Sequence, residues 1–332
     1  MGAMTFYAVI CVLSVIAAVL LILYIREHCR RQNREAKIQD EMRKNQEAMK
    51  DAGLISEQLF PVQLRQLLGI KTAAHMTTDV QQVFDTTILS VNVLNFINAI
   101  HTMSSQELFS AINEAFSRMI PHIAGSGGII DKFEKAGLSA LYMDSCDDAL
   151  TAAISLCEDV DGLAQPEKYA GFSMGLCYGS VMVGIVGHRE RLAAVSMSES
   201  VSLAEFLQQK AGKYSARILV TEGFVERIHS FHKRYNSRFL GYFYDHIREQ
   251  AIGIYDIYDG DLPESKQNKR RTRMIFEQGV DKFVHGNYDE ARLHFVEVLK
   301  ADRSDLAARE YLYLCDTYCN ANTVGDICIE KF

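Results

Sequence analysis

The chain has 332 residues, enough for about two domains of ordinary size, and 48% of them are hydrophobic, which is usual for a globular protein. Its formal net charge is −7, from 35 basic and 42 acidic residues. Because nucleic-acid backbones attract a basic protein surface, this balance argues against a role in nucleic-acid binding.

The N-terminal segment is strongly apolar. Residues 1–25 carry no charge, and the run from Phe6 to Ile25 has the length needed to cross a hydrocarbon core of about 30 Å. We expect residues 1–25 to be a transmembrane anchor, since a cleaved signal peptide would begin with basic residues and have a shorter apolar run. Several arginines follow directly, beginning with Arg26. The positive-inside rule therefore predicts a single-pass protein with its N-terminus outside and the bulk of the chain in the cytoplasm.

Residues 26–60 are rich in charged residues and are predicted to form a juxtamembrane helix. A weak heptad seam is formed by Ile38, Met42, Asn45, Met49 and Ala52. This pattern is compatible with a parallel coiled-coil stalk and with a single solvated helix, and the sequence leaves both open.

From about residue 83 to residue 260, apolar segments of strand length alternate with longer helical patterns. We expect strands over 85–94, 216–220 and 250–260, hairpins over 127–143 and 170–187, and helices over 104–123, 146–160 and 198–213. The order is βαββαβ with additional elements. It predicts an α/β fold, an α+β sandwich of ferredoxin-like topology with helices on one face of the sheet.

The C-terminal part of the chain, residues 272–322, is predicted to be helical. Residues 264–273 are polar and basic and suggest a linker. Over 272–322, the spacing of Gly279, Tyr288, Ala291 and Phe295 resembles a tetratricopeptide repeat. Such repeats normally need about three copies to bury their faces. We therefore expect this single repeat to dock on the preceding domain or on a partner protein.

Three motifs in the middle region occur in a specific order. They are "TILSVNVLNF" at 87–96, "GGIIDKFEKAGLSALY" at 127–142 and "SMGLCYGSVMVGIVGHRERLAAVSMSESVSLAEFL" at 173–207. Together they make residues 83–260 resemble the catalytic domain of class III nucleotidyl cyclases. The resemblance implies a cyclase fold that converts ATP or GTP to a cyclic nucleotide in a dimer, with the active site shared between the two subunits.

The resemblance also shows which site residues have changed. The family binds two Mg²⁺ ions through two aspartates, whose positions fall on Asn92 and Ala136. In the same turn, the family's glycine has become Lys135. An amide offers one weak oxygen ligand and a methyl group offers none, so the metal site is predicted to be degenerate. Glu134 would lie about 6–7 Å along the strand from Ala136, too far to replace the lost ligand.

The half-site that a partner subunit would use is altered as well. The family's base-reading pair falls on Lys132 and Val195, its ribose-orienting asparagine on Ser202, and its transition-state arginine on Phe206. Only the lysine is retained. Since both halves of the site have changed, we expect this chain neither to catalyse alone nor to complete a partner's active site.

The sequence therefore predicts a membrane-anchored pseudocyclase, which serves as a dimerisation, scaffold or regulatory module in intracellular signalling. We expect a homodimer or heterodimer through the cyclase-like domain, a protein partner at the helical repeat, and no cofactor. One alternative is an active or weakly active cyclase with relocated ligands, which would require Mg²⁺ or Mn²⁺. Another is a non-catalytic nucleotide sensor that uses Lys132.

Overall fold

The computed structural model divides the chain into two compact units, residues 1–60 and residues 61–332. The residues that it describes are 26, 40, 42–44, 62–70, 77–94, 103–143, 145–161, 171–188, 191–321 and 327–332. No helix among them is long and apolar enough to cross a membrane. The predicted membrane span lies outside these residues, as does most of the predicted juxtamembrane helix.

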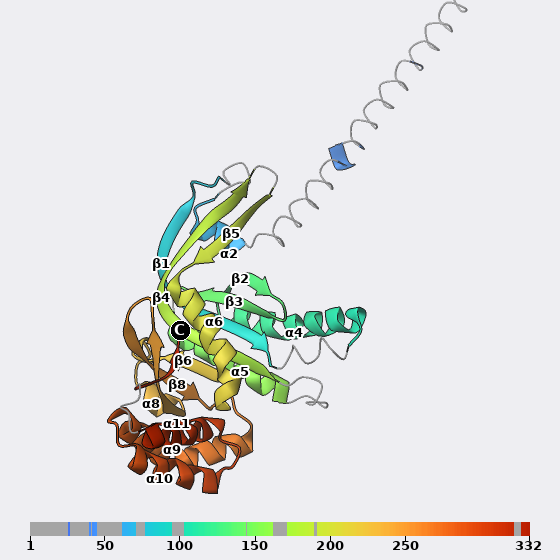
Figure 1. Ribbon diagram of the computed structural model, residues 1–332. Coiled ribbons are helices and arrows are strands. Elements are labelled where there is room, and N and C mark those ends of the chain that lie inside the picture. The colour runs from blue at the N-terminus through green and yellow to red at the C-terminus, as the bar shows by residue number, and fades with distance from the viewer. Residues whose placement is uncertain are drawn as a thin grey trace, which may run out of the picture. The chain divides into compact units, whose positions relative to one another are not determined.

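The second unit is built on a nine-stranded sheet (Figure 1). Its strand order is β2-β3-β1-β4-β6-β8-β7-β9, and β5 pairs with β4 alongside this path. The strands are β1 (Gln81–Val93), β2 (Ile129–Glu134), β3 (Gly137–Tyr142), β4 (Phe172–His188), β5 (Arg191–Met197), β6 (Ile218–Thr221), β7 (Ser237–Asp245), β8 (Gln250–Ile257) and β9 (Cys328–Lys331).

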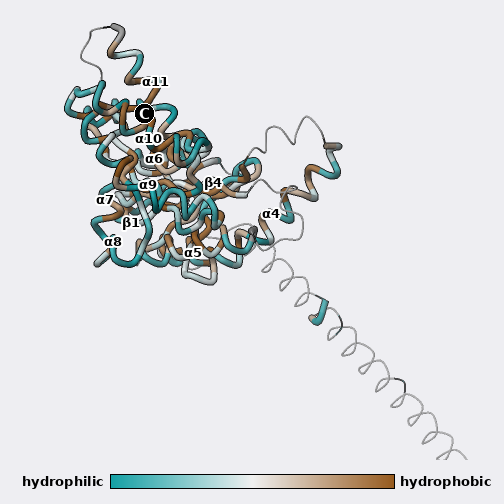
Figure 2. The backbone as a smooth tube through the Cα atoms, turned by 90° about the horizontal axis from the view of Figure 1, so that it is seen from below, coloured by the Kyte–Doolittle hydropathy of each residue, from teal (hydrophilic) through white to brown (hydrophobic). Residues whose placement is uncertain are grey.

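The helices of the cyclase-like region are α2 (Val62–Leu67), α4 (Ser105–Gly125), α5 (Cys146–Asp161), α6 (Glu199–Ala211), α7 (Glu222–Val225) and α8 (Phe231–Arg234), with a 3₁₀ turn, η3 (Gly212–Tyr214), after α6. The order β1-α4-β2-β3-α5-β4 agrees with the predicted βαββαβ order. Apolar and polar residues alternate along the helices (Figure 2), so each helix can bury one side.

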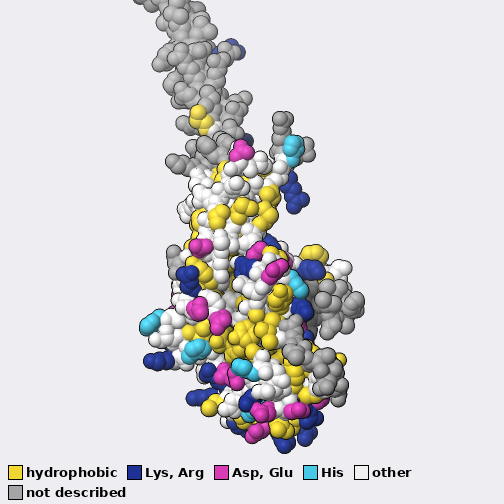
Figure 3. Space-filling view, turned by 60° about the vertical axis from the view of Figure 1, so that its left-hand side comes forward, with side chains coloured by type: hydrophobic (Ala, Val, Ile, Leu, Met, Phe, Trp, Pro, Cys, Tyr) yellow, Lys and Arg dark blue, Asp and Glu magenta, His cyan; other side chains and the backbone are white. Residues whose placement is uncertain are grey.

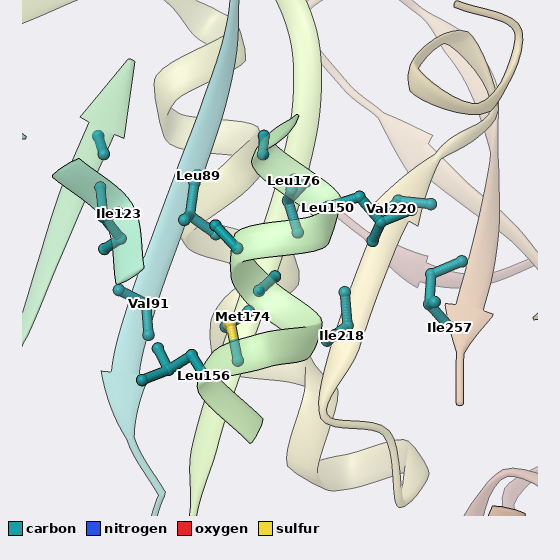
Figure 4. Close-up of a cluster of buried hydrophobic side chains, with 14 of the residues drawn as sticks. Leu89, Val91, Ile123, Leu150, Leu156, Met174, Leu176, Ile218, Val220 and Ile257 are labelled. Carbon is teal, nitrogen blue, oxygen red and sulfur yellow. The ribbon is translucent and has the colours of Figure 1, made fainter. Parts of the chain in front are cut away.

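The main core lies between the sheet and the helices α4 and α5. Leu89 and Leu176 from neighbouring strands meet Leu150 of α5 there, and all three side chains are fully buried (Figure 4). Directly opposite residues of an antiparallel pair share a face, and Leu89 lies opposite Leu176 in the β1–β4 register. Burial of this apolar face holds the two helices on the sheet.

Helix α6 lies on the other face of the sheet, so the prediction that all helices share one face is wrong. A Cβ atom on Gly175 would stand 2.1 Å from the Ala204 carbonyl oxygen, and one on Gly179 would stand 2.1 Å from Ser200 Oγ. These glycines allow the close approach of α6 to β4. The hairpin predicted over 170–187 is also wrong, because Phe172–His188 forms the single continuous strand β4.

Beyond the core, β1, β4 and β5 continue as a three-stranded ribbon (Figure 1). Val83 pairs with Met182, and Met182 pairs with Met197 on the other side. Since these residues are directly opposite, their side chains share one face of the ribbon. We call Val83, Met182, Val186 and Met197 the ribbon patch.

Three helices follow the cyclase-like region: α9 (Pro263–Val284), α10 (Tyr288–Ala301) and α11 (Leu306–Ala321). The predicted linker over 264–273 is wrong, because these residues form the first half of α9. Its polar composition has a structural cause. Lys269 and Thr272 are buried, and Lys269 binds the carboxylates of Asp256 and Asp261 at 2.9 Å and 2.7 Å.

The three helices dock on the sheet through buried charges, which we call the Arg238 network. Arg238 of β7 is fully buried and donates from Nε to Asp256 of β8 at 2.9 Å and from both Nη atoms to Asp305 at the start of α11. Its guanidinium stacks on the Phe276 ring of α9, 4.4 Å from the ring centre. Of the two docking sites left open by the sequence, the structure shows contact with the preceding domain.

An Arg238→Met substitution should remove the cation while keeping much of the buried volume. Asp305 would then be left as a buried carboxylate without its main partner, at an expected cost of about 3–5 kcal/mol in the free energy of unfolding. The measurement is urea denaturation followed by circular dichroism. The matched control is Arg234→Met, whose exposed ion pair with Asp147 is screened by solvent and should contribute far less to stability. Equal effects of the two substitutions would contradict a central role of the Arg238 network.

Candidate functional site

The structure places the two predicted metal positions side by side. Asn92 lies near the end of β1 and Ala136 lies in the turn between β2 and β3. Asn92 pairs with Gly137, and the Val93 amide donates to the Ala136 carbonyl oxygen at 3.2 Å. The methyl group of Ala136 is fully buried, whereas Asn92 is partly buried. The two positions predicted to correspond to the metal ligands are therefore adjacent across β1 and the β2–β3 turn.

The residues at this position do not fit a pair of divalent cations. Asn92 supplies an amide and Ala136 supplies no ligand atom, although Mg²⁺ is usually held through carboxylates. The nearest candidate replacement, Glu134, is already bound to Lys132 at 2.7 Å. Within the described ranges, no group of three or more His, Cys, Asp or Glu side chains could hold a metal ion.

The turn keeps a backbone shape that suits glycine. Lys135 has a φ angle of 33°, in the left-handed region that L-residues seldom adopt. At this position the cyclase pattern has glycine. The turn thus has a backbone conformation that suits glycine, although residues 135 and 136 are lysine and alanine.

Lys132, which the cyclase resemblance assigns to base reading, forms ion pairs with two carboxylates of the same chain. Its Nζ lies 2.6 Å from Glu205 of α6 and 2.7 Å from Glu134. Burial alone would lower the pKa of Lys132, but the two carboxylates outweigh it and raise the pKa above its usual value. The lysine remains charged, and a nucleotide base would have to displace a carboxylate to reach it.

The strands that carry Lys132 and Val195 meet through neighbouring residues. Asp131 of β2 accepts hydrogen bonds from Ser196 of β5 at 2.6 Å and from Ser139 of β3 at 3.3 Å. Burial raises the pKa of Asp131 despite these two hydrogen bonds, which act in the opposite direction. This polar contact could not be predicted from the sequence, because Asp131, Ser139 and Ser196 lie on three different strands and form no known sequence motif.

Ser202 and Phe206 lie one turn apart on α6 and so point to the same side of the helix. Ser202 is exposed and its hydroxyl bonds back to the Ser198 carbonyl oxygen at 3.5 Å. The Phe206 ring packs against Phe332 and Phe243, with ring centres 5.1 Å and 6.0 Å away. An aromatic cluster therefore surrounds the position at which the cyclase resemblance predicts the transition-state arginine.

The C-terminal strand β9 completes this cluster, and sequence analysis did not predict it. It pairs in parallel with β7, and Glu330 accepts hydrogen bonds from Lys210 at 2.8 Å, from Tyr214 at 2.9 Å and from Lys213. Burial would raise the pKa of Glu330, but these donors together hold it below its usual value. A strand of four residues is too short to produce a periodic signal in the sequence.

A cleft of about 920 Å³ lies beside Asn92 and the β2–β3 turn. It is lined by Asn92 and Val93 of β1, Leu94 after it, Glu134 of β2, Lys135 of the turn, Ser173 of β4, Gln208 and Gln209 of α6, and Gly212 and Lys213 of η3. Gln208 donates to Ser173 Oγ at 2.6 Å, and Lys213 is held by Glu310 and Glu330. The lining of the cleft is mixed, and several of its polar groups are already bound to one another.

Comparison with known proteins identifies the fold. No family model matches the chain. It is 22% identical over 273 residues to a terminal-differentiation specific adenylate cyclase of Dictyostelium discoideum, which covers 78% of this chain and 13% of that protein. It is 25% identical over 184 residues to an adenylate cyclase of Anabaena cylindrica, which covers 52% of this chain and 36% of the relative. The chain therefore spans about an eighth of the length of the first relative and little more than a third of the second.

The structure of a bacterial light-regulated adenylyl cyclase superposes on the chain with a TM-score of 0.58 and 17% identity, covering 69% of this chain and 67% of that one. This likeness shows the fold. The chain thus contains an adenylate/guanylate cyclase-like domain with the class III fold.

A Glu330→Gln substitution should lower the free energy of unfolding by about 1.5–3 kcal/mol at pH 7, because hydrogen bonds to charged groups are lost. The folded-state pKa of Glu330 lies below 4.5, so the stabilisation is present above about pH 4.5 and is lost as the pH falls through the folded value. Urea titrations of both proteins between pH 7 and pH 3.5 should show their difference shrinking below about pH 4.5. Glu297→Gln, at an exposed position on α10, serves as the control. A difference that does not change with pH would exclude ionised Glu330 as its source.

Proposed function

We propose that the chain is a pseudocyclase, a cyclase-like domain without turnover that serves as a dimerisation and scaffold module in intracellular signalling. The observation that carries this proposal is the buried methyl group of Ala136 beside the Asn92 amide. The two carboxylates of the family stand at these positions. Without them, no charge at this position can balance the two Mg²⁺ ions that the family's reaction requires.

The other half of the site supports the same proposal. Phe206 cannot donate a hydrogen bond to a developing phosphoryl charge, and it is packed against Phe332. Loss of one preorganised donor typically costs about 10²–10³ in rate. Lys132 is bound by two carboxylates, which weakens the alternative of a nucleotide sensor that depends on this residue.

The location of the module is also part of the proposal. We propose that residues 1–25 anchor the chain in a membrane, that the N-terminus lies outside, and that the cyclase-like domain faces the cytoplasm. Helices α9–α11 would form a tetratricopeptide-like surface for a partner protein. The scaffold role requires no cofactor. Mg²⁺ or Mn²⁺ would be bound only by the alternative, an active cyclase with relocated ligands.

The ribbon patch supports dimerisation. Val83 is 65% exposed and Met197 is 48% exposed, and both lie on the face that they share with Met182. Apolar side chains are visible on the upper part of the molecule, where β1, β4 and β5 form the ribbon (Figure 3). A contiguous apolar surface of this kind favours association with another protein surface. A second copy of the chain is the partner that the cyclase resemblance implies.

Incubation of the full chain with ATP or GTP and Mg²⁺ or Mn²⁺ should yield no cyclic nucleotide above that of a Lys132→Ala control. The double substitution Asn92→Asp and Ala136→Asp should also be inactive, because Ser202 and Phe206 still leave the phosphoryl charge unsupported. Product formation is followed by chromatography, with an active cyclase assayed in parallel. Turnover by the unmodified chain would instead establish the alternative with relocated ligands. Turnover by the double variant alone would show that another chain supplies the missing half-site.

A Met197→Glu substitution should convert a dimer to a monomer, because it places a charge in the ribbon patch, where an interface would remove it from water. Light scattering over a range of concentrations measures the change. Met274→Glu is the matched control, since Met274 is 73% exposed on α9, away from the ribbon. A dimer that survives Met197→Glu would place the interface elsewhere.

A further inference from the structure

A second surface lies on the C-terminal helices, between α10 and α11. The two helices are antiparallel, since Arg292 near the start of α10 binds Asp316 near the end of α11 at 2.6 Å. A groove with a volume of about 440 Å³ lies between side chains of the two helices. It is lined by Val296, Leu299, Lys300, Arg303, Arg309 and Leu312. We call it the α10–α11 groove.

The floor of the groove is apolar. Val296 and Leu299 come from α10 and Leu312 comes from α11. Leu293 lies three residues before Val296 on α10 and Tyr313 follows Leu312 on α11, and each is 66% exposed. The next described element after α11 is β9, which returns to the sheet beside β7. Within the described ranges, no further helix follows α11 to cover these side chains.

The rim of the groove is basic at one end. Lys300, Arg303 and Arg309 gather where α10 passes into α11, and the described part of the chain gives none of them an ion-pair partner. The Arg309 guanidinium donates only to the Arg303 carbonyl oxygen, at 2.7 Å. The nearby carboxylates of Asp302 and Asp305 are buried and bind Ser304 and Arg238. A molecule with a net charge of −7 therefore presents a local basic rim beside an apolar floor.

The shape of the groove favours a helix as its occupant. A helix satisfies most of its backbone donors and acceptors internally, so it can place an apolar side against Val296, Leu299 and Leu312 without burying unpaired backbone groups. From Leu293 to Lys300 the surface runs for about two helical turns, or roughly 10–12 Å. A partner helix would need apolar residues spaced three and four apart along one side.

We propose that the α10–α11 groove binds an amphipathic helix of a partner protein that carries carboxylates at one end. The carboxylates pair with Lys300, Arg303 and Arg309, and the apolar side packs on Val296, Leu299 and Leu312. This inference rests on the proposed scaffold role and names the class of partner for it. It does not depend on the degenerate cyclase site, so a cyclase assay and a binding assay at the groove can fail independently.

The test uses the full chain and synthetic fluorescein-labelled peptides of about 16 residues, a length at which helix formation is feasible. One peptide has glutamates in its first turn and leucines along one side. A second has lysines in place of the glutamates, and a third has the same composition as the first with its leucines spread around the helix. Fluorescence anisotropy should show the first peptide binding at least about tenfold more tightly than the other two, with affinity falling as salt is added.

Variants of the groove separate this site from general charge effects. Lys300→Glu with Arg303→Glu should weaken binding of the acidic peptide by at least about tenfold. Lys233→Glu with Arg270→Glu makes the same change of charge at exposed positions outside the groove lining, and should leave binding within about twofold. Leu312→Asp tests the apolar floor, and circular dichroism confirms that each variant is folded.

Two results would overturn the proposal. One is equal binding of the acidic and basic peptides, or equal binding to the groove and control variants. The other is a change in the oligomeric state of the chain on Lys300→Glu with Arg303→Glu, without any effect on peptide binding. That result would assign the groove to a second copy of the chain.

Discussion

The Arg238 network is the interaction on which the C-terminal half of the structure depends. A fully buried guanidinium joins two strands to the start of α11, while Lys269 of α9 binds Asp256, which is also a partner of Arg238. Buried charges of this kind are stable only when all partners are present, because each unpaired charge bears its full desolvation cost. Lys269 and Leu306 also hold the turn at Ser215, which follows α6. The helices are therefore part of the cyclase-like body rather than a separate module.

The cyclase-like domain combines preserved geometry with altered chemistry. Gly175 and Gly179 keep the space that α6 requires, and Lys135 keeps the left-handed backbone of the turn. These features fix the backbone, so side chains can differ at neighbouring positions without disturbing the sheet. The side chains at two of the predicted site positions are themselves packed: the Ala136 methyl group is fully buried, and the Phe206 ring contacts Phe243 and Phe332. A backbone held in this way is what the proposed scaffold role requires.

The sequence predicted what depends on local pattern. The apolar runs located β1, the β2–β3 hairpin, α4, α5 and α6, and the cyclase resemblance placed Asn92 beside Ala136. Features that depend on tertiary contacts were not predicted from the sequence. A hairpin was predicted over 170–187 in place of β4, because the helix that packs on Gly175 and Gly179, α6, lies elsewhere in the sequence. The first half of α9 was predicted to be a linker because its polar composition does not reveal that Lys269 is buried and binds Asp256 and Asp261. The Phe206–Phe332 contact joins residues far apart in the chain, and the four-residue β9 gives no periodic signal.

The position of β9 constrains the order in which the molecule can assemble. This strand pairs with β7, yet α9, α10 and α11 lie between the two in the sequence. During synthesis from the N-terminus, the edge of the sheet at β7 stays open until all three helices have left the ribosome. Pairing across so large a sequence separation is slow because the intervening chain must first be ordered. β9 can thus cover the edge of β7 only after α9–α11 have been made, and a ribosome that stalls within α11 would release a chain in which that edge is unpaired, the kind of surface that chaperones recognise.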